Sequence, residues 1–444
     1  MTEQAQVRFC DLLCFLWPNP FMAGQPNILW IVTTQWRAAA TGYAGDANAR
    51  TPWLDGLASE AVNFTQAVTP HPLGPQARAA LLTGKLCPEN GVSGYWDPLP
   101  ADARTVAHAL KDRGYATAWF GKWHLDQRDR AAPFVGDAHA KHIVPPARRG
   151  GFEFWEGFEG GFLLNDPWLH GTRLAEPKHF KGYQADILVQ RAAEWLKSPR
   201  ERPAFCVVSL ESPHPPYHAP APHVAEVLPA ELKLRDNVPR GGPVEQQARE
   251  ELAGYYAHIE ATDRAIGKLI AEVDLTETAV VFTSVHGDMH GSHGLFRKAW
   301  PYEESVRVPL LILQRQKAEG GRKKVTGAKD GSPVSLVDLS HMAVAWAEGR
   351  EWHCKRDNAL ISMPSATEIA LQCPVAWRGF RSTKHKLVLK ADDPNEPGSS
   401  PDRGSGQGLR PWLYFDLQND PLEMKNLAGD PARAGEIAEF RRLM

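Results

Sequence analysis

Short apolar runs recur along the chain, separated by longer segments in which apolar residues repeat with the spacing of a helix. The runs predict β-strands at residues 27–32, 115–120, 204–210, 278–284 and 308–313. Helical spacing is found at residues 53–61, 78–83, 105–113, 183–197, 246–273 and 335–347. Strands that are apolar throughout are buried on both faces. Their alternation with helices therefore predicts an α/β fold with a mostly parallel sheet that helices cover on both sides.

The remaining segments lack either period. Residues 126–182 are rich in glycine, proline and aromatic residues, and we interpret them as an irregular insertion. Residues 215–243 contain many prolines and are expected to form a long loop. These two segments match no motif, so the sequence alone does not identify a ligand.

The pattern changes towards the C-terminus. Residues 377–388 predict an antiparallel strand pair and residues 413–417 a further strand, with a loop rich in Pro, Gly and Ser at 391–410 between them. We therefore expect three parts in the chain. They are an N-terminal extension at 1–25, an α/β domain at 26–350 and a small-sheet subdomain at 351–444.

Composition excludes some classes of partner. The 444 residues include 50 basic and 52 acidic side chains, which gives a net charge of −2. A nearly neutral chain gives no reason to expect nucleic acid or an anionic membrane surface as a partner. The sequence carries no signal for the oligomeric state.

Cysteine usage and the N-terminal residues bear on the cellular compartment. Six scattered cysteines in a chain of this length favour free thiols over a disulfide framework. The apolar stretch from Phe9 to Trp17 is interrupted by Asp11, and no small-residue cleavage site follows it. We expect a cytoplasmic protein, with a periplasmic or secreted location as the alternative.

Polar residues follow the predicted strands at their carboxyl ends. Gln35, Lys122, His214 and His286 each come directly after a different strand. In a parallel α/β sheet, ligands bind outside the carboxyl ends of the strands. The sequence therefore predicts that these side chains meet in one site.

Five short motifs occur in order along the chain: TPWLD at 51–55, AALLTG at 79–84, GKWH at 121–124, HGDM at 286–289 and KAWPYEE at 298–304. Together they resemble the sulfatase family of the alkaline-phosphatase superfamily, and the likeness extends over residues 26–430. The resemblance implies a bacterial-type sulfuric ester hydrolase. It also implies an alkaline-phosphatase-like sandwich, with a large, mostly parallel sheet covered by helices and a small C-terminal antiparallel sheet with a helix.

The chain departs from the family at the nucleophile. Family members convert a cysteine or serine before the LLTG helix into formylglycine, which attacks the sulfate ester. Gly74 stands at that position, and Gln76 and Ala77 replace the proline and serine that follow. Because glycine has no side chain to oxidise or ionise, the resemblance implies that this nucleophile is lost.

The metal positions depart as well. The family holds calcium or a similar divalent cation with acidic side chains, and Gln35 and His286 match two of its ligands. Thr34 and Val285 stand where the family has aspartates. Hard divalent cations gain affinity from carboxylate charge. We therefore expect such a cation to be bound weakly or not at all.

The basic positions of the family site are kept. Arg78, predicted at a helix start, matches the motif arginine, and Lys122, His124, His214 and Lys298 match the other basic residues. Without the metal carboxylates, these residues predict a positively charged pocket. Its expected partner is a small-molecule sulfate or phosphate ester or a free oxyanion.

Nearby residues that could replace the missing groups are interpreted as structural. Asp288 and Asp46 are expected to be turn residues rather than substitute metal ligands. Cys87 is expected to be a packed thiol rather than a substitute nucleophile. Thr69 and His71 are polar but are not placed by spacing at the helix start.

Three functional interpretations remain open. The first, which we favour, is a degenerate homologue that binds an oxyanion or its ester without turnover, an anion-binding pseudoenzyme. The second is an active hydrolase of sulfate, phosphate or phosphonate esters, in which a histidine activates water directly. The third is a non-enzymatic interaction protein that uses the scaffold as a surface.

Overall fold

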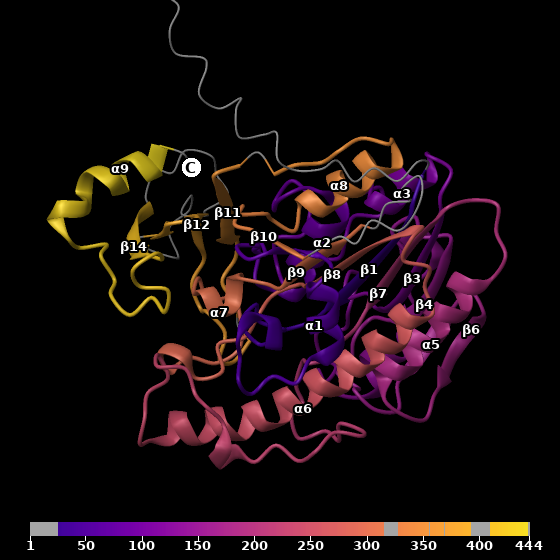
Figure 1. The fold of residues 1–444 in the computed structure, drawn as a ribbon, viewed down its shortest axis with the longest axis horizontal. Coiled ribbons are helices and arrows are strands. Elements are labelled where there is room, and N and C mark those ends of the chain that lie inside the picture. The colour runs from indigo at the N-terminus through magenta and orange to yellow at the C-terminus, as the bar shows by residue number, and fades with distance from the viewer. Residues whose placement is uncertain (1–24, 315–326, 355, 368, 392–408, 443–444) are drawn as a thin grey trace, which may run out of the picture.

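The computed structural model describes residues 25–314, 327–354, 356–367, 369–391 and 409–442 (Figure 1). Most of the predicted N-terminal extension and most of the predicted loop at 391–410 lie outside the described residues, as do Cys10 and Cys14. The described cysteines Cys87, Cys206, Cys354 and Cys373 form no disulfide.

A ten-stranded sheet forms the centre of the molecule, in the order β10-β2-β9-β8-β1-β7-β3-β4-β5-β6. Its strands are β1 (Asn27–Thr33), β2 (Val62–Phe64), β3 (Ala116–Lys122), β4 (Phe154–Phe158), β5 (Trp168–Gly171), β6 (Leu174–His179), β7 (Ala204–Ser209), β8 (Thr278–Ser284), β9 (Leu310–Leu313) and β10 (Ala328–Asp330). Strands β8, β1, β7, β3 and β4 run parallel, and antiparallel pairs lie further out. The predicted parallel core is confirmed.

The apolar runs are explained by burial on both sides of this sheet. On β1, Leu29 and Ile31 face one hydrophobic core, whereas Ile28, Trp30 and Val32 face the other. Burying one such side chain contributes about 1.5–3 kcal/mol. The central strands therefore stay apolar at consecutive positions and cannot alternate with polar residues.

Two groups of helices cover the two faces (Figure 1). One face carries α1 (Pro52–Ala58), α5 (Gln184–Lys197) and α6 (Pro243–Ala271), and the other carries α2 (Gly74–Thr83), α3 (Val106–Lys111) and α8 (Asp338–Ala347). Shorter helices are α4 (Asp137–Ala140), α7 (Glu303–Val306) and the 3-10 turns η1 (Gly42–Ala44), η2 (Pro146–Arg148), η3 (Pro229–Glu231), η4 (Ser292–Gly294) and η5 (Pro431–Arg433). None of the helices within the described ranges is both long and apolar enough to span a bilayer.

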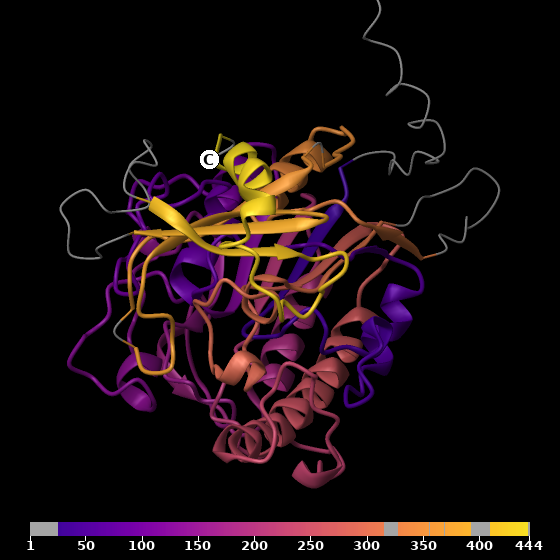
Figure 2. The same ribbon diagram turned by 90° about the vertical axis from the view of Figure 1, so that its left-hand side faces the viewer.

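A second sheet of four antiparallel strands lies beside the main one (Figure 2). It contains β11 (Asn358–Met363), β12 (Trp377–Ser382), β13 (His385–Ala391) and β14 (Leu409–Asp416), and α9 (Ala434–Arg442) packs on it. Trp377 is fully buried in a cluster with Val68 and Ala299 of the main domain, and its indole donates to the Ala299 carbonyl at 2.8 Å. This contact fixes the small sheet against the segment that carries Lys298.

Two local predictions are wrong. The segment 126–182 is not irregular throughout, because it supplies β4, β5 and β6, and β4 pairs in parallel with β3. These strands contain glycines and charged residues, so they lack the apolar run that marks the central strands. Helix α2 begins at Gly74 and not near Arg78, because Pro75 is tolerated in the first turn, where its missing N–H costs nothing.

Candidate oxyanion site

A cavity of about 140 Å³ opens at the carboxyl ends of the central strands. The residues that line it include Thr34, Gly74, Tyr95, Lys122, His124, Phe134, Phe162, His214, His286, Lys298 and Gln372. The structure thus brings together most of the positions that sequence analysis selected. Gln35 and Arg78 lie directly behind the wall, since each bonds a lining residue.

Gly74 opens helix α2 at the cavity wall. Its backbone is helical and does not need glycine, so the limit on a side chain there is spatial. A Cβ at this position would lie 2.8 Å from His124 Nδ1 and 3.5 Å from Arg78 Nη1. The imidazole of His124 therefore fills the space in which a side chain at position 74 would begin.

His124 presents an N–H group to the cavity. Its Nε2 lies 2.5 Å from Nη1 of Arg128, and a guanidinium only donates, so Nε2 accepts. Burial, followed by the charge of Arg128, lowers the pKa of His124 well below its usual value, which keeps the ring neutral. The remaining proton is therefore assigned to Nδ1, which has no partner.

Arg128 is a site residue that sequence analysis missed. Its guanidinium lies over Tyr95 at 4.5 Å and Trp96 at 5.2 Å, and it forms an ion pair with Glu159 at 3.5 Å. It lies in the segment interpreted as an irregular insertion, where no periodic pattern marks individual residues. Only its position four residues after His124 could have indicated from the sequence that Arg128 belongs to the site.

Arg78 lies one turn inside α2 and not at the helix start, which corrects the prediction. Its Nη2 donates to Thr34 Oγ1 at 2.8 Å, and Thr34 in turn donates to the Leu210 carbonyl at 3.0 Å. Nε and Nη1 are buried and have no partner in the part of the chain that the structure describes. Burial lowers the pKa of Arg78 to about 10, so the guanidinium stays charged at neutral pH and has N–H groups available for an anion.

The sequence suggested that Lys122 is a free cation. In the structure it pairs with a buried acid instead. Its Nζ lies 2.7 Å from Glu211 Oε1, and both side chains are almost completely buried. Burial lowers the pKa of Lys122 to about 8, and Glu211 opposes that shift. Glu211 lies two residues after β7, so its place near a strand end was the signal that sequence analysis overlooked.

Lys298 joins two predicted ligand positions. Its Nζ donates to Gln35 Oε1 at 2.7 Å and contacts His214 Nε2 at 3.0 Å. Nδ1 of His214 lies 2.8 Å from the Pro215 carbonyl, so Nδ1 donates and Nε2 accepts from the ammonium. Burial lowers the pKa of Lys298 to about 7.

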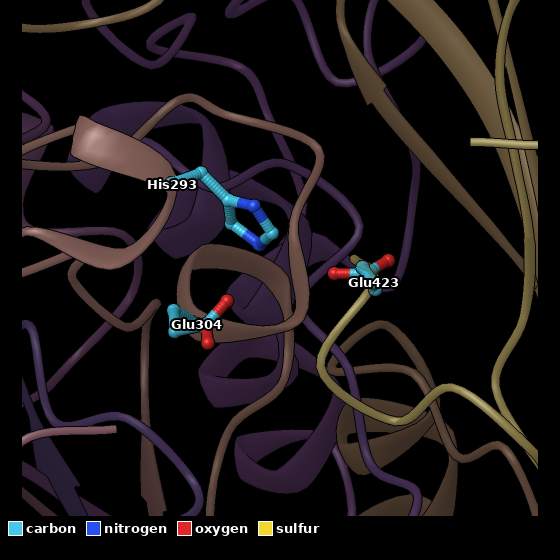
Figure 3. Close-up of side chains that lie close together, drawn as sticks. All are labelled: His293, Glu304 and Glu423. Atoms are coloured by element: carbon cyan, nitrogen blue, oxygen red, sulfur yellow. The ribbon is translucent and has the colours of Figure 1, made fainter. Parts of the chain in front are cut away.

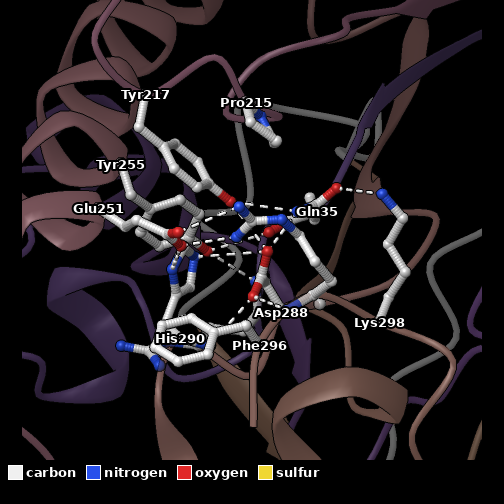
Figure 4. A network of polar contacts seen from close by, with 12 residues as sticks. Gln35, Pro215, Tyr217, Glu251, Tyr255, Asp288, His290, Phe296 and Lys298 are labelled. Carbon is white, nitrogen blue, oxygen red and sulfur yellow. Dashed lines mark hydrogen bonds and ion pairs between the residues drawn. The ribbon is translucent and has the colours of Figure 1, made fainter. Parts of the chain in front are cut away.

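Asp288 anchors this end of the site (Figure 4). Its carboxylate accepts from the side chains of Gln35 and Tyr217 and from the backbone N–H groups of His290 and Arg297. Burial would raise its pKa, but these donors and the nearby charges hold it below the usual range. The predicted turn role is present, and Asp288 also fixes the Gln35 amide.

The positions that match the family's metal ligands do not fit a hard divalent cation here. Gln35 Oε1 accepts from Lys298, and Thr34 Oγ1 accepts from Arg78. Val285 belongs to a buried apolar cluster. His286 has an unpartnered Nε2, but one imidazole amid several cations gives a poor site for calcium.

A separate group of possible ligands consists of His293, Glu304 and Glu423, whose ligand atoms lie within 4.8 Å of one another (Figure 3). Arg235 Nε lies 3.1 Å from Glu304, and Lys386 Nζ lies 2.5 Å from Glu423. A metal ion would have to compete with both cations. We interpret the group as an ion-pair cluster that joins α7 to the turn after β14.

The remaining candidates lie outside the cavity lining. Asp46 accepts from Tyr256 and from the backbone of Asn48, as expected of a turn residue. The Cys87 thiol donates to the Val92 carbonyl at 2.8 Å. His71 is buried, and its ring contacts Ser362. None of these groups replaces the side chain that Gly74 lacks.

The arrangement of a large, mostly parallel sheet with a small antiparallel sheet matches sulfatase and alkaline-phosphatase-like structures. A protein solved in complex with its substrate D-glucosamine-2-N,6-O-disulfate has a TM-score of 0.73 at 20% identity, over 94% of this chain and 96% of the other. The phosphonate monoester hydrolase of Agrobacterium radiobacter has a TM-score of 0.68 at 19% identity, over 94% of each chain.

Comparison of sequences identifies the family, whereas the structural likeness shows the fold alone. The family model described as Sulfatase matches residues 26–349. The ulvan-active sulfatase of Formosa agariphila is 34% identical over 433 residues, which cover 92% of this chain and 78% of that protein. The chain therefore belongs to the sulfatase family, whose members generally bind a divalent metal.

Proposed function

We propose that this member of the sulfatase family binds an oxyanion, or a small-molecule ester of one, without formylglycine-dependent turnover. The observation that carries the proposal is at position 74. Gly74 offers no nucleophile, and the ring of His124 takes up the space next to it. Restoring a nucleophile there would require His124 to move.

The groups around Gly74 support anion binding. Within the described ranges, Arg78 has two buried nitrogen atoms without a partner, and His124 has an unpartnered Nδ1–H. Leaving a buried donor unpaired costs about 1–3 kcal/mol, and an anion that accepts from these groups removes that cost. Hydrogen bonds to charged donors are roughly twice as strong as neutral ones.

The proposed binding does not require a metal. The oxygen atoms of Gln35 and Thr34 are already engaged by Lys298 and Arg78, so cationic side chains supply the positive charge. Chelation is therefore expected to leave binding unchanged.

Isothermal titration with phosphate and with sulfate at low salt, with and without a chelator, tests the proposal. We expect at least one ion to bind in both conditions. Arg78→Met should weaken binding by at least about tenfold, because a charge-assisted hydrogen bond contributes about 1.5–3 kcal/mol. Arg104→Met is the matched control, since Arg104 is exposed and paired with Asp112. Absence of binding, or binding only after calcium is added, would contradict the proposal.

A second candidate function rests on His286. Among the three cavity histidines, Nε2 of His286 alone retains a free lone pair, since His124 and His214 accept through theirs. A water held there could attack a sulfate, phosphate or phosphonate ester directly, with general-base help of about 10²–10⁴-fold. Hydrolysis that survives chelation and is lost in His286→Gln would support this candidate. No turnover across the three ester classes would exclude it.

A further inference from the structure

The polar groups that line the cavity or lie directly behind its wall are mainly hydrogen-bond donors. Arg78, behind the wall, and His124 place N–H groups near Gly74, and Lys122 and Lys298 also line the cavity. Such a lining suits the oxygen atoms of any tetrahedral oxyanion. Phosphate and sulfate are alike in shape, so these donors alone do not separate them.

His286 differs from the other groups because it offers an acceptor. Its Nδ1 lies 2.9 Å from the Gly287 carbonyl, so Nδ1 carries the proton and donates. Its Nε2 is then a bare lone pair, fully buried and without a partner among the described residues, on a residue that lines the cavity. A ligand atom that carries hydrogen can satisfy this buried acceptor directly, whereas an oxygen without hydrogen cannot.

The surroundings keep His286 in this neutral form. Lys298 and Arg78 lie nearby and oppose a further positive charge, and Asp288 is the acidic group that favours one. The acceptor role therefore follows from the hydrogen bond to Gly287 and from the cations around the ring.

We infer that the cavity selects an oxyanion that carries its own proton, namely hydrogenphosphate or the singly ionised form of a phosphate monoester, over sulfate. Hydrogenphosphate can donate its hydroxyl to His286 Nε2 while its other oxygens accept from Arg78 and His124. Sulfate has no proton near neutral pH, so one of its oxygens would face the lone pair. The inference rests on the proposed anion binding and names the ligand class of that same site.

The expected size of the preference follows from unpaired polar groups. Sites built to hydrogen-bond a ligand hydroxyl reject analogues that lack it, because a buried polar group is then left unpaired. A cost of about 1.4–2.8 kcal/mol, within the range for one such group, corresponds to roughly tenfold to 100-fold in affinity. Gln372 at the rim also has an unpartnered oxygen, but its amide can turn and offer NH₂, so it does not discriminate.

Titration of the whole chain with inorganic phosphate and with sulfate, just above neutral pH and at equal ionic strength, tests the inference. Hydrogenphosphate and sulfate then carry the same charge and differ by one proton. We expect phosphate to bind at least about tenfold more tightly. His286→Gln should remove most of this preference, because the amide can donate to sulfate. His353→Gln, at an exposed histidine, is the matched control and should keep it.

The outcomes separate the inference from the proposed function. Equal or tighter binding of sulfate to the unmodified chain would overturn the inference and leave anion binding intact. A folded His286→Gln protein with an unchanged ratio would also overturn it. Binding of neither ion would instead overturn the proposed function. Proton uptake on sulfate binding that is present in the unmodified chain and lost in His286→Gln, measured in two buffers of different ionisation enthalpy, would show that His286 becomes a donor and would refute the selection; uptake common to both proteins belongs to Lys122 and Lys298.

Discussion

The imidazole of His124 stands where a side chain at position 74 would begin, because a Cβ built on Gly74 meets His124 Nδ1 at 2.8 Å. Contacts this short are not tolerated between these atoms, so a larger residue must move the ring. The ring is held by Arg128 at its other nitrogen. Gly74 and His124 therefore form one structural unit, and a substitution at either position changes the packing at the other.

Substitution of Gly74 by serine is the most direct test of that unit. We expect Gly74→Ser to displace His124, lower the melting temperature and weaken phosphate binding by about tenfold, through the loss of one charged-site hydrogen bond. The double variant with His124→Ala should lose less than the sum of the two single effects, because each removes the same contact. Strictly additive effects in thermal melts and titrations would show that the two residues act independently.

The buried pair of Lys122 and Glu211 predicts that loss of the acid lowers stability and that a bound anion restores part of it. Glu211→Gln leaves the ammonium without a charged partner, which should lower the free energy of unfolding by up to about 3 kcal/mol. Added phosphate should raise the melting temperature more in this variant than in the unmodified chain, since the anion supplies the missing negative charge. Glu153→Gln is the control, because Glu153 pairs with Arg202 nearer the surface. An equal phosphate effect in both proteins would speak against the prediction.

Anion affinity should fall as pH rises. The pKa of Lys298 is about 7 and that of Lys122 about 8, and each lysine attracts an anion only in its protonated form. A bound anion favours the charged form and raises both pKa values, so the loss should be centred above them. Titrations between about pH 6 and about pH 9 would measure it, with ordinary lysine near 10.4 as the reference. Affinity that increases over this range would refute the assignment.

In the unliganded chain, the same two lysines should make the free energy of unfolding rise with pH, whereas they make anion affinity fall. Their pKa values are lower in the folded state than in the unfolded state, so the unfolded chain binds more protons between about pH 7 and about pH 10. Stability from these two groups therefore rises with pH over that window. Chemical denaturation of Lys298→Met against the unmodified chain should show a smaller rise for the variant.

Aspartates placed at the family's metal-ligand positions should destabilise the chain when no cation is bound. Val285 packs in an apolar cluster, and a charged aspartate there lacks a partner. We expect Val285→Asp alone to lower the melting temperature, with no rescue by calcium. Calcium should stabilise the chain only when Thr34→Asp accompanies it, because two carboxylates are then available. Thermal melts with calcium and with a chelator measure both effects, and rescue of the single variant would show that the remaining residues already suffice.

Much of the fold could be read from the chain. The β1 run from Ile28 to Val32 is apolar at every position because both faces of the central sheet are covered, and that pattern is visible without coordinates. The ends of β1, β3, β7 and β8 fixed the location of the site, since parallel strands bring their carboxyl ends to one edge. The absence of a side chain at Gly74 is also a property of the sequence alone.

Tertiary structure decided what each of those side chains does. No periodic pattern marks Arg128 or Glu211 itself in the sequence. Yet Arg128 sets the proton position on His124, and Glu211 neutralises Lys122. The free lone pair of His286 depends on a hydrogen bond to Gly287 and on the absence of any partner in the described structure around Nε2. Hydrophobic periodicity encodes burial over a few residues, whereas donor and acceptor roles depend on atoms that long loops bring within about 3 Å.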